Sequence, residues 1–558
     1  MLSRIRLFAL LALFTLPIFA GNLDQVVVRG DTAQKIDAFM SRLERLGFSG
    51  AIIVGKDGNV ILQKAYGFAD PESKRAYTID TASTVGSITK QFTAAAILAL
   101  EEEGKLSVSD PITKYFKDVP PDKSAITLHQ LLTHSAGFPG AIGDDEEPTG
   151  RDEFIRRAMS RKLPFAPGSA YEYSNVGFSL LAAIIEQITG GSYERYLHDR
   201  LFVRAGMEHT GYVIPKWNPA KLARGVRDGE LVPPFEGSWA ADGPYWHLRG
   251  NGGIMTIPAD MFRWHLALLG DKVLSAASRK KLFTPYVKEG DAPSSYAYGW
   301  AIFPLPNGHQ LIAHNGGNGI FAADFRRYID DGVVIFITSN VSERPSIAAD
   351  RFIGRIALGQ EVPMPPRVVG VPMEKLQALE GTYGSLKVTA KPTGLLLTPL
   401  DRDALAMFIT PLPAERADIF AKRSNSIADA IVKRDYKTLH ELFGGQIPLE
   451  MIEKRQQTLE SHNGEVKSAE VIAVARGREG PTSILRLDFE HGHQFLELNW
   501  DGPITVAGIR IMPELRASEF VPTSSTEFAS YDMSSGETKS AKFEDGKLLI
   551  GEKTLAKR

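Results

Sequence analysis

The 558-residue sequence contains no cysteine. This absence excludes disulfide bonds, thiolate metal sites, a thiol nucleophile and a lipid-modified N-terminal cysteine. An excess of charge of one sign is also missing, because the formal net charge is −2. We therefore expect no nucleic-acid partner. No His-Glu-x-x-His or other zinc spacing occurs either, so we expect no metal and no other cofactor.

Long apolar runs are absent after the N-terminus, so no integral membrane span is expected in the mature protein. The first twenty residues carry Arg4 and Arg6, the apolar stretch LFALLALFTLPIFA and a small-residue pair, Ala20-Gly21. A membrane anchor is the alternative, but the run is short for a span and contains Pro17. We interpret residues 1–20 as a signal peptide and expect a periplasmic or secreted protein.

The composition, with 43% apolar and 23% charged residues, is globular, and the chain is too long for one ordinary domain. Residues 32–46 have helical spacing, and two strands follow around the turn Lys56-Asp57-Gly58. Strand patterns return between 296 and 340, after a mostly helical stretch. Strands from both ends of one segment, with helices between them, predict a mixed sheet that carries a helical insertion.

The residue composition changes at the end of this segment. Residues 361–372, EVPMPPRVVGVP, are rich in Pro and Val and are predicted to be an extended linker. Short strand patterns occupy 373–413 and 516–558, whereas 414–515 contains helical segments followed by hairpins. We therefore expect a domain over 21–360 and a separate C-terminal region.

The stretch TVGSITKQFTAAAILALEEEGKL places Ser87 and Lys90 three residues apart at the start of an apolar helix. Positions i and i+3 share one helix face, so the lysine would lie beside the hydroxyl. A buried lysine has a lowered pKa and can accept the serine proton. The helix is apolar all round, which indicates a central position.

A purely structural interpretation of this pair stays open, because serine is a common helix cap and lysine is common everywhere. The chain contains a second Ser-x-x-Lys, Ser278 to Lys281, which has the pattern of a solvated basic helix face. Two further features favour a catalytic pair at Ser87.

The first feature is Tyr173-Ser174-Asn175, which precedes another apolar helix. A tyrosine near a cation can have a depressed pKa and act as a general base, and Asn175 can bind the lysine or a substrate amide. The alternative is a capped helix start with a packed aromatic side chain. The second feature is the end of a predicted strand, where glycines would let a substrate approach the strand edge; its residues are His314, Asn315, Gly316 and Gly317.

In order and spacing, these elements resemble the serine β-lactamase and penicillin-binding-protein superfamily, in its class C-like, esterase and D-amino-acid peptidase branch. The resemblance spans about residues 32–360 and includes SGAIIVGKDG, ITLHQLLTHSAGFPG and GNGGIMTIPADMFRW. The family's Ser-x-x-Lys falls on Ser87 and Lys90, and its Tyr-x-Asn on Tyr173 and Asn175. The Lys-Thr-Gly of β-lactamases is replaced here by His314-Asn315-Gly316. A histidine is mostly neutral at pH 7, which argues against true β-lactamase activity.

The resemblance implies an α/β fold with an antiparallel sheet, flanking helices and a helical subdomain. It also implies that Ser87 is the nucleophile, that Lys90 and Tyr173 share the role of base, and that the N–H groups of Ser87 and Gly317 bind the oxyanion. In the C-terminal region, 373–413 and 516–558 resemble a lipocalin-like barrel, and 414–515 resembles an NTF2-like α+β insertion.

The leading hypothesis is a secreted serine hydrolase that forms an acyl-enzyme with a small-molecule or peptide substrate, such as a D-amino-acid peptide or a cell-wall fragment. A carboxylesterase or weak β-lactamase with the same site is an alternative. A non-catalytic binding or sensor protein that keeps the fold is a third possibility. The sequence predicts no oligomeric state.

Overall fold

The structure is a computed structural model that describes residues 23–227, 230–234, 239–341, 346–445, 447–477, 480–502, 505–533 and 535–558. The predicted signal peptide, residues 1–20, lies outside the described residues. The chain divides into two compact units, Met1–Val362 and Pro363–Arg558. No helix in the described ranges is long and apolar enough to cross a membrane.

Within the described ranges, unit 1 contains a nine-stranded antiparallel sheet in the order β1-β3-β2-β15-β14-β13-β12-β11-β10. Its first three strands precede the helical part of the unit, and the other six follow it. As predicted, Asp57 and Gly58 form the turn between β2 and β3, both at positive φ. The strands are β1 (Val27–Val28), β2 (Gly50–Lys56), β3 (Asn59–Tyr66), β10 (Val287–Lys288), β11 (Ser295–Tyr296), β12 (Ala301–Pro304), β13 (Gln310–Gly317), β14 (Ala322–Tyr328) and β15 (Val333–Ser339).

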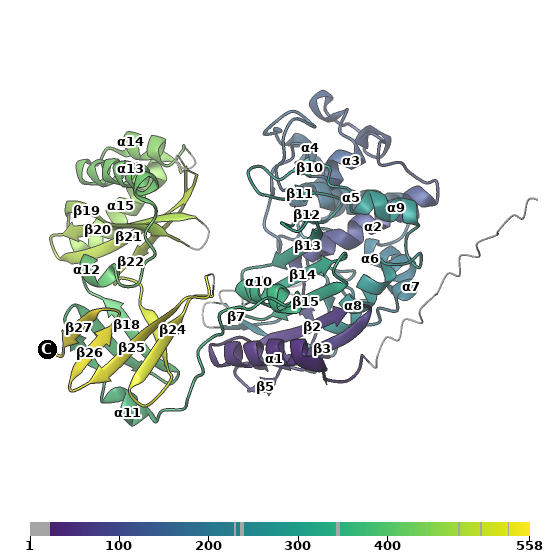
Figure 1. The fold of residues 1–558 in the computed structure, drawn as a ribbon. Helices are drawn as coiled ribbons and strands as arrows, with labels where there is room; N and C mark the ends of the chain where they lie inside the picture. Colours follow the sequence, from purple (N-terminus) through teal and green to yellow (C-terminus); the bar gives the residue numbers. More distant parts are fainter. Residues whose placement is uncertain are drawn as a thin grey trace, which may run out of the picture. The chain divides into compact units, whose positions relative to one another are not determined.

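Helices cover both faces of this sheet. On one side α1 (Gly30–Arg45) packs against β3 and against α10 (Ser346–Ala357), and α10 packs against β14 and β15, whereas α8 (Pro258–Ala267) packs against β2 and β15 (Figure 1). Side chains alternate between the faces of a strand. Val334 and Phe336 of β15 therefore join the core that contains α8, and Ile335 is buried on the other face.

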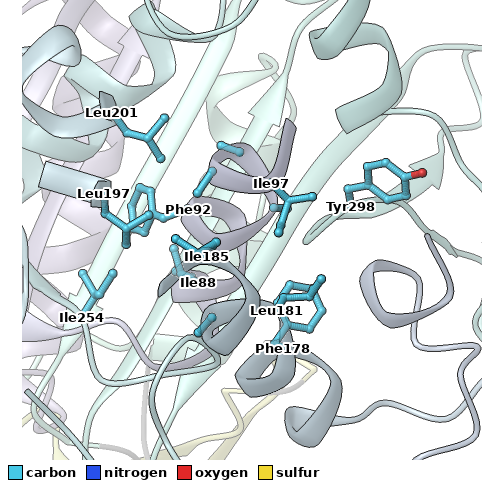
Figure 2. Close-up of a cluster of buried hydrophobic side chains, with 14 of the residues drawn as sticks. Ile88, Phe92, Ile97, Phe178, Leu181, Ile185, Leu197, Leu201, Ile254 and Tyr298 are labelled. Carbon is cyan, nitrogen blue, oxygen red and sulfur yellow. The ribbon is translucent and has the colours of Figure 1, made fainter. Parts of the chain in front are cut away.

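The helical part of unit 1 surrounds α2 (Thr89–Glu102), in which every side chain from Thr89 to Leu100 is buried. Figure 2 shows Phe92 and Ile97 of α2 among side chains of α5 (Asn175–Thr189) and the following helices. The predicted central position of this helix is confirmed. The other helices are α3 (Leu128–Leu132), α4 (Arg151–Ser160), α6 (Tyr193–Leu197), α7 (Val203–Ala205) and α9 (Ala276–Leu282), with short helical turns η1 (Gly86–Ile88), η2 (Ile112–Lys114), η3 (Pro121–Lys123), η4 (His198–Phe202) and η5 (Pro219–Lys221).

Three small two-stranded ladders complete the described part of unit 1. One of them, β6 with β9, precedes η1 directly and pairs Thr84 with Met255. It therefore fixes the entry to the turn that carries Ser87. The strands are β4 (Phe68–Asp70), β5 (Arg75–Ala76), β6 (Ser83–Thr84), β7 (Gly225–Arg227), β8 (Glu230–Val232) and β9 (Met255–Thr256).

Unit 2 contains an eight-stranded antiparallel sheet in the order β16-β17-β18-β23-β24-β25-β26-β27. A bridge between Tyr383 and Lys557 nearly closes it into a barrel, and apolar side chains such as Leu397 and Phe520 fill its core. Its strands and two short helices are β16 (Gly381–Tyr383), β17 (Leu386–Lys391), β18 (Gly394–Pro399), β23 (Ser518–Pro522), β24 (Glu527–Tyr531), β25 (Thr538–Glu544), β26 (Lys547–Ile550), β27 (Lys553–Ala556), α11 (Met373–Gln377) and α12 (Arg402–Leu405).

An α+β segment lies between β18 and β23 in the sequence. Its helix α13 packs on strands β19 and β20 of a four-stranded antiparallel sheet, and a separate apolar core includes Ile427 and Leu498. The predicted mixed α/β fold with a barrel-like C-terminal region is confirmed. The elements are α13 (Ala414–Lys433), α14 (Tyr436–Leu442), α15 (Leu449–Asn463), β19 (Val466–Arg476), β20 (Pro481–Phe489), β21 (Gly492–Asp501) and β22 (Thr505–Met512).

Candidate active site

Ser87 lies in the single turn η1, immediately before α2. The first N–H groups of a helix have no intrahelical acceptor, and the helix dipole favours negative charge at this end. The Ser87 side chain is partly accessible, whereas its neighbours Gly86 and Ile88 are buried. An anion that develops on or beside the Ser87 hydroxyl would therefore be stabilised by the local backbone.

Lys90 is completely buried, at 0% exposure, one turn after Ser87. Its Nζ lies 3.0 Å from Ser87 Oγ, 2.8 Å from Asn175 Oδ1 and 2.8 Å from the Asn251 carbonyl oxygen. It also lies 4.7 Å from the centroid of the Tyr173 ring. The fold thus brings together Ser87 and Lys90, Tyr173 and Asn175, and the carbonyl of Asn251 from three distant segments.

Burial holds the pKa of Lys90 well below its ordinary value, and the charge of Asp145 offsets only part of this effect. The neutral amine has two N–H groups and one lone pair. Asn175 Oδ1 and the Asn251 carbonyl can only accept hydrogen bonds, so they take both N–H groups. Ser87 is the one partner that can donate, and its hydroxyl therefore faces the lone pair. This is the arrangement that a general base requires.

Tyr173 completes the group: its ring centroid lies 4.7 Å from Lys90 Nζ, and its hydroxyl interacts with the Ser87 side chain. The expectation of a depressed tyrosine pKa was wrong: burial raises the pKa of Tyr173 above its ordinary value, although the interaction with Ser87 lowers it in part. The physical reason is that Lys90 is desolvated too and so supplies no cation to stabilise a phenolate.

The segment Tyr173-Ser174-Asn175 is a helix start as well as part of the site. Ser174 is the N-cap of α5, and its Oγ accepts from the Gly177 N–H at 3.3 Å. Its own N–H donates to His134 Nδ1 at 3.0 Å. These bonds fix the backbone on both sides of the cap. They keep Tyr173 and Asn175 beside Lys90. The motif is therefore a capped helix start and a part of the site at the same time.

His314, on β13, is buried beside Tyr173, with 6.3 Å between the ring centroids. Its Nδ1 lies 2.6 Å from the Asn315 carbonyl oxygen, which can only accept, so Nδ1 carries the proton. Its Nε2 then accepts from the Tyr296 hydroxyl at 2.9 Å. Burial lowers the pKa of His314 to about 4. The ring is therefore neutral at pH 7, and both of its nitrogens have protein partners.

The end of β13 lies directly against η1, and glycines make this approach possible. A Cβ on Gly316 would lie 2.1 Å from the Val85 carbonyl oxygen and 2.6 Å from Ser87 N. A Cβ on Gly86, where φ is +50°, would lie 2.5 Å from Gly317 N. Any larger residue at these positions would separate the two backbones.

The N–H of Gly317 points away from β14. Asn318 N donates to the Phe321 carbonyl at 3.2 Å, and Phe321 N donates to Asn318 Oδ1 at 2.9 Å, so the facing backbone groups of this pair point toward each other. The preceding pair, Gly317 with Ala322, is then of the non-hydrogen-bonded type. Strand β12 reaches only as far as Ala313 on the other side of β13. The Gly317 N–H is therefore directed to the open edge of β13, where the backbone of η1 lies.

A Gly316→Ala substitution is expected to lower the acylation rate about 10²- to 10³-fold, the loss that follows removal of one oxyanion donor. The added methyl group would push apart Ser87 N and the end of β13. The measurement is the rate of covalent labelling by an acylating probe, and Gly270→Ala is the control because its φ is not positive and nothing lies within 4 Å of its Cβ position. Equal rates in wild type and Gly316→Ala would contradict the inferred role of this contact.

Two residues of the site had no recognisable signal in the sequence. The Asn251 carbonyl contacts Lys90, and Tyr296, on β11, contacts His314. A backbone carbonyl carries no residue-type signature, and a tyrosine 18 positions before a histidine suggests nothing by itself. Asn251 lies within a segment that contributed to the resemblance, but its function there was not foreseen.

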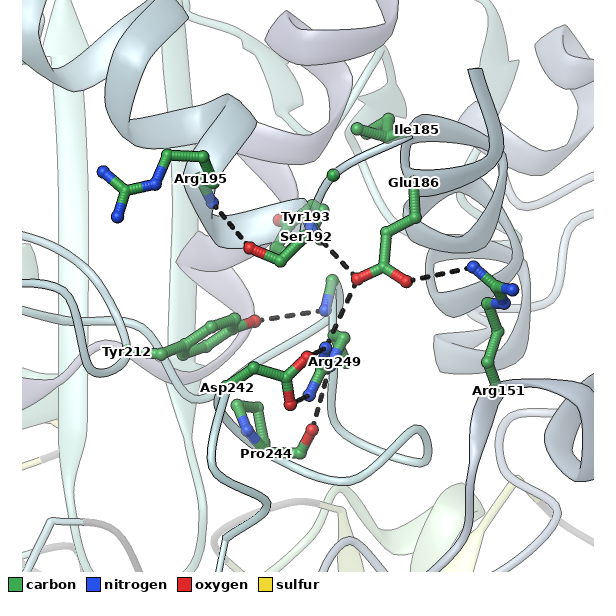
Figure 3. Close-up of polar contacts among 12 residues, drawn as sticks. Arg151, Ile185, Glu186, Ser192, Tyr193, Arg195, Tyr212, Asp242, Pro244 and Arg249 are labelled. Atoms are coloured by element: carbon green, nitrogen blue, oxygen red, sulfur yellow. Dashed lines mark hydrogen bonds and ion pairs between the residues drawn. The ribbon is translucent and has the colours of Figure 1, made fainter. Parts of the chain in front are cut away.

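A polar network positions the loop that presents Asn251. Figure 3 shows Arg249 joined to both carboxylate oxygens of Asp242, each at 2.8 Å, and to Glu186 of α5 at 3.3 Å. The Gly250 N–H donates to the Tyr212 hydroxyl at 3.1 Å. The Asn251 side chain donates to Ser179 Oγ of α5 at 2.9 Å. The loop is thereby fixed to the helix that carries Asn175.

The remaining predicted positions have more limited contacts. Asn315 is exposed, and its side chain leaves β13 on the face opposite to His314; its carbonyl is the part that contacts the site. Ser278 of the second Ser-x-x-Lys lies on α9, where Lys281 pairs with Glu101 at 2.8 Å. In the described ranges, no group of three or more His, Asp or Glu side chains could hold a metal ion.

This fold and this grouping of serine, lysine and tyrosine are those of the serine hydrolase superfamily that includes β-lactamases and penicillin-binding proteins. The sequence model of the family described as Beta-lactamase matches residues 32–358. The chain therefore belongs to the beta-lactamase family.

Two curated relatives match the same region. Penicillin-binding protein 4* of Bacillus subtilis (strain 168) is 27% identical over 316 residues, which is 54% of this chain and 70% of that protein. Protein flp of Staphylococcus aureus (strain MW2) is 29% identical over 304 residues, 51% of this chain and 58% of that protein. An octameric penicillin-binding protein homologue from Pyrococcus abyssi has a similar fold, with a TM-score of 0.53 at 20% identity. The match covers 94% of this chain and 99% of that protein's chain.

Proposed function

We propose that this protein is a serine hydrolase that cleaves an amide or ester through an acyl-enzyme on Ser87. The observation that carries the proposal is the 3.0 Å contact between Lys90 Nζ and Ser87 Oγ, with both other contacts of the amine made to pure acceptors. Neutral Lys90 accepts the serine proton as Ser87 Oγ attacks the acyl carbon. The resulting ammonium is stabilised by Asn175 and the Asn251 carbonyl.

The tetrahedral oxyanion is bound by the N–H groups of Ser87 and Gly317. Tyr173 then relays this proton from the Lys90 ammonium to the leaving group. It donates its own phenolic proton as it receives another, so it remains a neutral phenol. After the leaving group departs, the same groups activate the water that hydrolyses the acyl-enzyme. Lys90 is the base in this scheme, because burial lowers its pKa while it raises that of Tyr173.

The substrate class that we propose is a peptide of D-amino acids, a cell-wall fragment or a related ester. A β-lactam is disfavoured, because the residue in the place of the β-lactamase lysine is a neutral histidine whose Nδ1 and Nε2 bind Asn315 and Tyr296. It therefore offers no positive charge to a substrate carboxylate. From the N-terminal sequence we also propose that the protein acts in the periplasm or outside the cell.

The test of the proposed function is covalent labelling with a fluorophosphonate or fluorescent penicillin probe, followed by mass spectrometry of the labelled peptide. We expect the adduct on Ser87 and none on Ser278, although both serines precede a lysine at i+3. A panel of D-peptides, aryl esters and cephalosporins would then rank substrates. Failure of every acylating probe to label the folded protein would favour a non-catalytic binding protein.

The labelling rate is expected to rise with pH and to reach a plateau well below pH 10.5, the region where an exposed lysine loses its proton. Only neutral Lys90 can act as base, and burial lowers its pKa, so protonation inactivates the enzyme as the pH falls. His314, with a pKa of about 4, adds no transition between about pH 6 and about pH 9. A rate that still increases up to about pH 10 would show that Lys90 is not desolvated.

A further inference from the structure

His134 lies just after helix α3, in a backbone conformation that histidine seldom adopts. The helix ends at Leu132, and His134 has a φ of +58°, in the left-handed region where a helix end usually carries glycine or asparagine. The Ser135 N–H donates to the Gln130 carbonyl at 3.0 Å, a bond typical of such an end. Glycine would therefore satisfy the backbone, and the imidazole is present at a cost in strain.

His134 binds the chain on both sides of Tyr173. Its carbonyl accepts from the Glu172 N–H at 3.0 Å, and its Nδ1 accepts from the Ser174 N–H at 3.0 Å. The ring itself lies beside the phenol, with 4.3 Å between the two ring centroids. One residue thus fixes the backbone before and after Tyr173, and Asn175 follows directly.

The imidazole is enclosed by protein. It is 2% exposed, and its centroid lies 5.1 Å from the ring of Phe178 and 4.5 Å from that of Tyr296. Because Nδ1 accepts, Nε2 carries the proton, and Nε2 has no hydrogen-bond partner among the described residues. Burial holds the pKa of His134 well below its ordinary value, so the lone pair of Nδ1 is available at neutral pH. The bond to Ser174 is the one hydrogen bond of this ring within the described ranges.

We propose that His134 is a positioning residue for acylation, which holds the segment Glu172–Asn175 so that Tyr173 and Asn175 meet Lys90. This inference rests on the proposed function. A shift of the segment would alter the 2.8 Å contact between Lys90 Nζ and Asn175 Oδ1 and the place of the phenol. A misplacement of about 1 Å can cost about 10²-fold in rate. His134 acts through these residues and takes no part in the proton transfer.

Two substitutions separate the acceptor atom from the packing of the ring. His134→Phe keeps an aromatic ring but leaves the Ser174 N–H without its acceptor. His134→Asn loses the ring, but its Oδ1 can take the place of Nδ1, and asparagine tolerates the left-handed backbone. We expect His134→Phe to lower the maximal rate of probe labelling at Ser87 about 10- to 100-fold, with the half-saturating probe concentration nearly unchanged. His134→Asn should keep most of the wild-type rate.

A ring that acts only by packing predicts the opposite order, with a wild-type rate in His134→Phe and a slow His134→Asn. That order, or equal rates in the wild type and both variants, would overturn the proposal. His129→Phe is the matched control, because His129 belongs to α3 and its Nδ1 contacts the Tyr298 hydroxyl at 2.7 Å instead of the segment Glu172–Asn175. We expect this control to be labelled at the wild-type rate.

Crystal structures of the variants test the same role without any activity. In His134→Phe we expect Tyr173 and Asn175 to move by about 1 Å and the contact of Asn175 with Lys90 to lengthen, whereas His134→Asn should keep both in place. An unmoved segment in His134→Phe would refute the positioning role. If no acylating probe labels the wild type, the proposed function fails, and this comparison still decides whether His134 holds the segment.

Discussion

Replacement of Ser87 by alanine is expected to abolish covalent labelling and to lower the turnover of any substrate by about 10⁴- to 10⁶-fold, the range for loss of a catalytic nucleophile. The hydroxyl is the one group of the site that can form the acyl bond, and no cysteine exists anywhere in the chain to replace it. Stability should change little, because the side chain is only partly buried. The measurement is the intact mass of the protein after incubation with the probe.

The matched control for this variant is Ser278→Ala. Ser278 also precedes a lysine at i+3, but Lys281 has a side chain that is 45% exposed and pairs with Glu101. Lys281 is therefore solvated and bound to a carboxylate instead of facing the Ser278 hydroxyl as a buried base. Labelling of Ser278→Ala should equal that of the wild type. If Ser87→Ala still formed an adduct of the same mass at the same rate, the nucleophile would have to be another residue.

The Lys90→Met variant is expected to lower the acylation rate about 10²- to 10⁴-fold, the usual contribution of a general base. Methionine has a similar length and no proton-accepting group. The variant leaves Asn175 Oδ1 and the Asn251 carbonyl without their donor, so a loss of about 1–3 kcal/mol of stability per acceptor is also expected. The measurements are the labelling rate and the free energy of unfolding in urea. The residual rate should no longer depend on pH in the range where the wild type does.

Lys123→Met is the control for replacement of a buried lysine. Lys123 is 3% exposed and forms an ion pair with Asp122 at 2.7 Å, so it has a carboxylate partner that Lys90 lacks. We expect this variant to label at the wild-type rate with a wild-type pH profile. If Lys90→Met were as active as Lys123→Met, with the pH dependence unchanged, Tyr173 and not Lys90 would be the base.

Much of the fold could be predicted from local patterns. The strand patterns of β13 to β15, the helical spacing of α1 and the apolar run of α2 are properties of short segments. It was predictable that strands from the two ends of the unit, such as β2 and β15, share one sheet, because strand patterns occur at both ends. The register of that pair, with Ile53 opposite Phe336, depends on packing across nearly 300 positions and has no local signal.

The sequence by itself determined which side chains could do the chemistry. Ser87 and Lys90 are neighbours because i and i+3 meet on any helix, and Tyr173 and Asn175 flank a helix cap whose geometry is also local. The tertiary structure alone decided their protonation states and the contact of Lys90 with the Asn251 carbonyl. The physical reason is that a pKa depends on how much water distant segments exclude, and that exclusion exists only after the chain has folded.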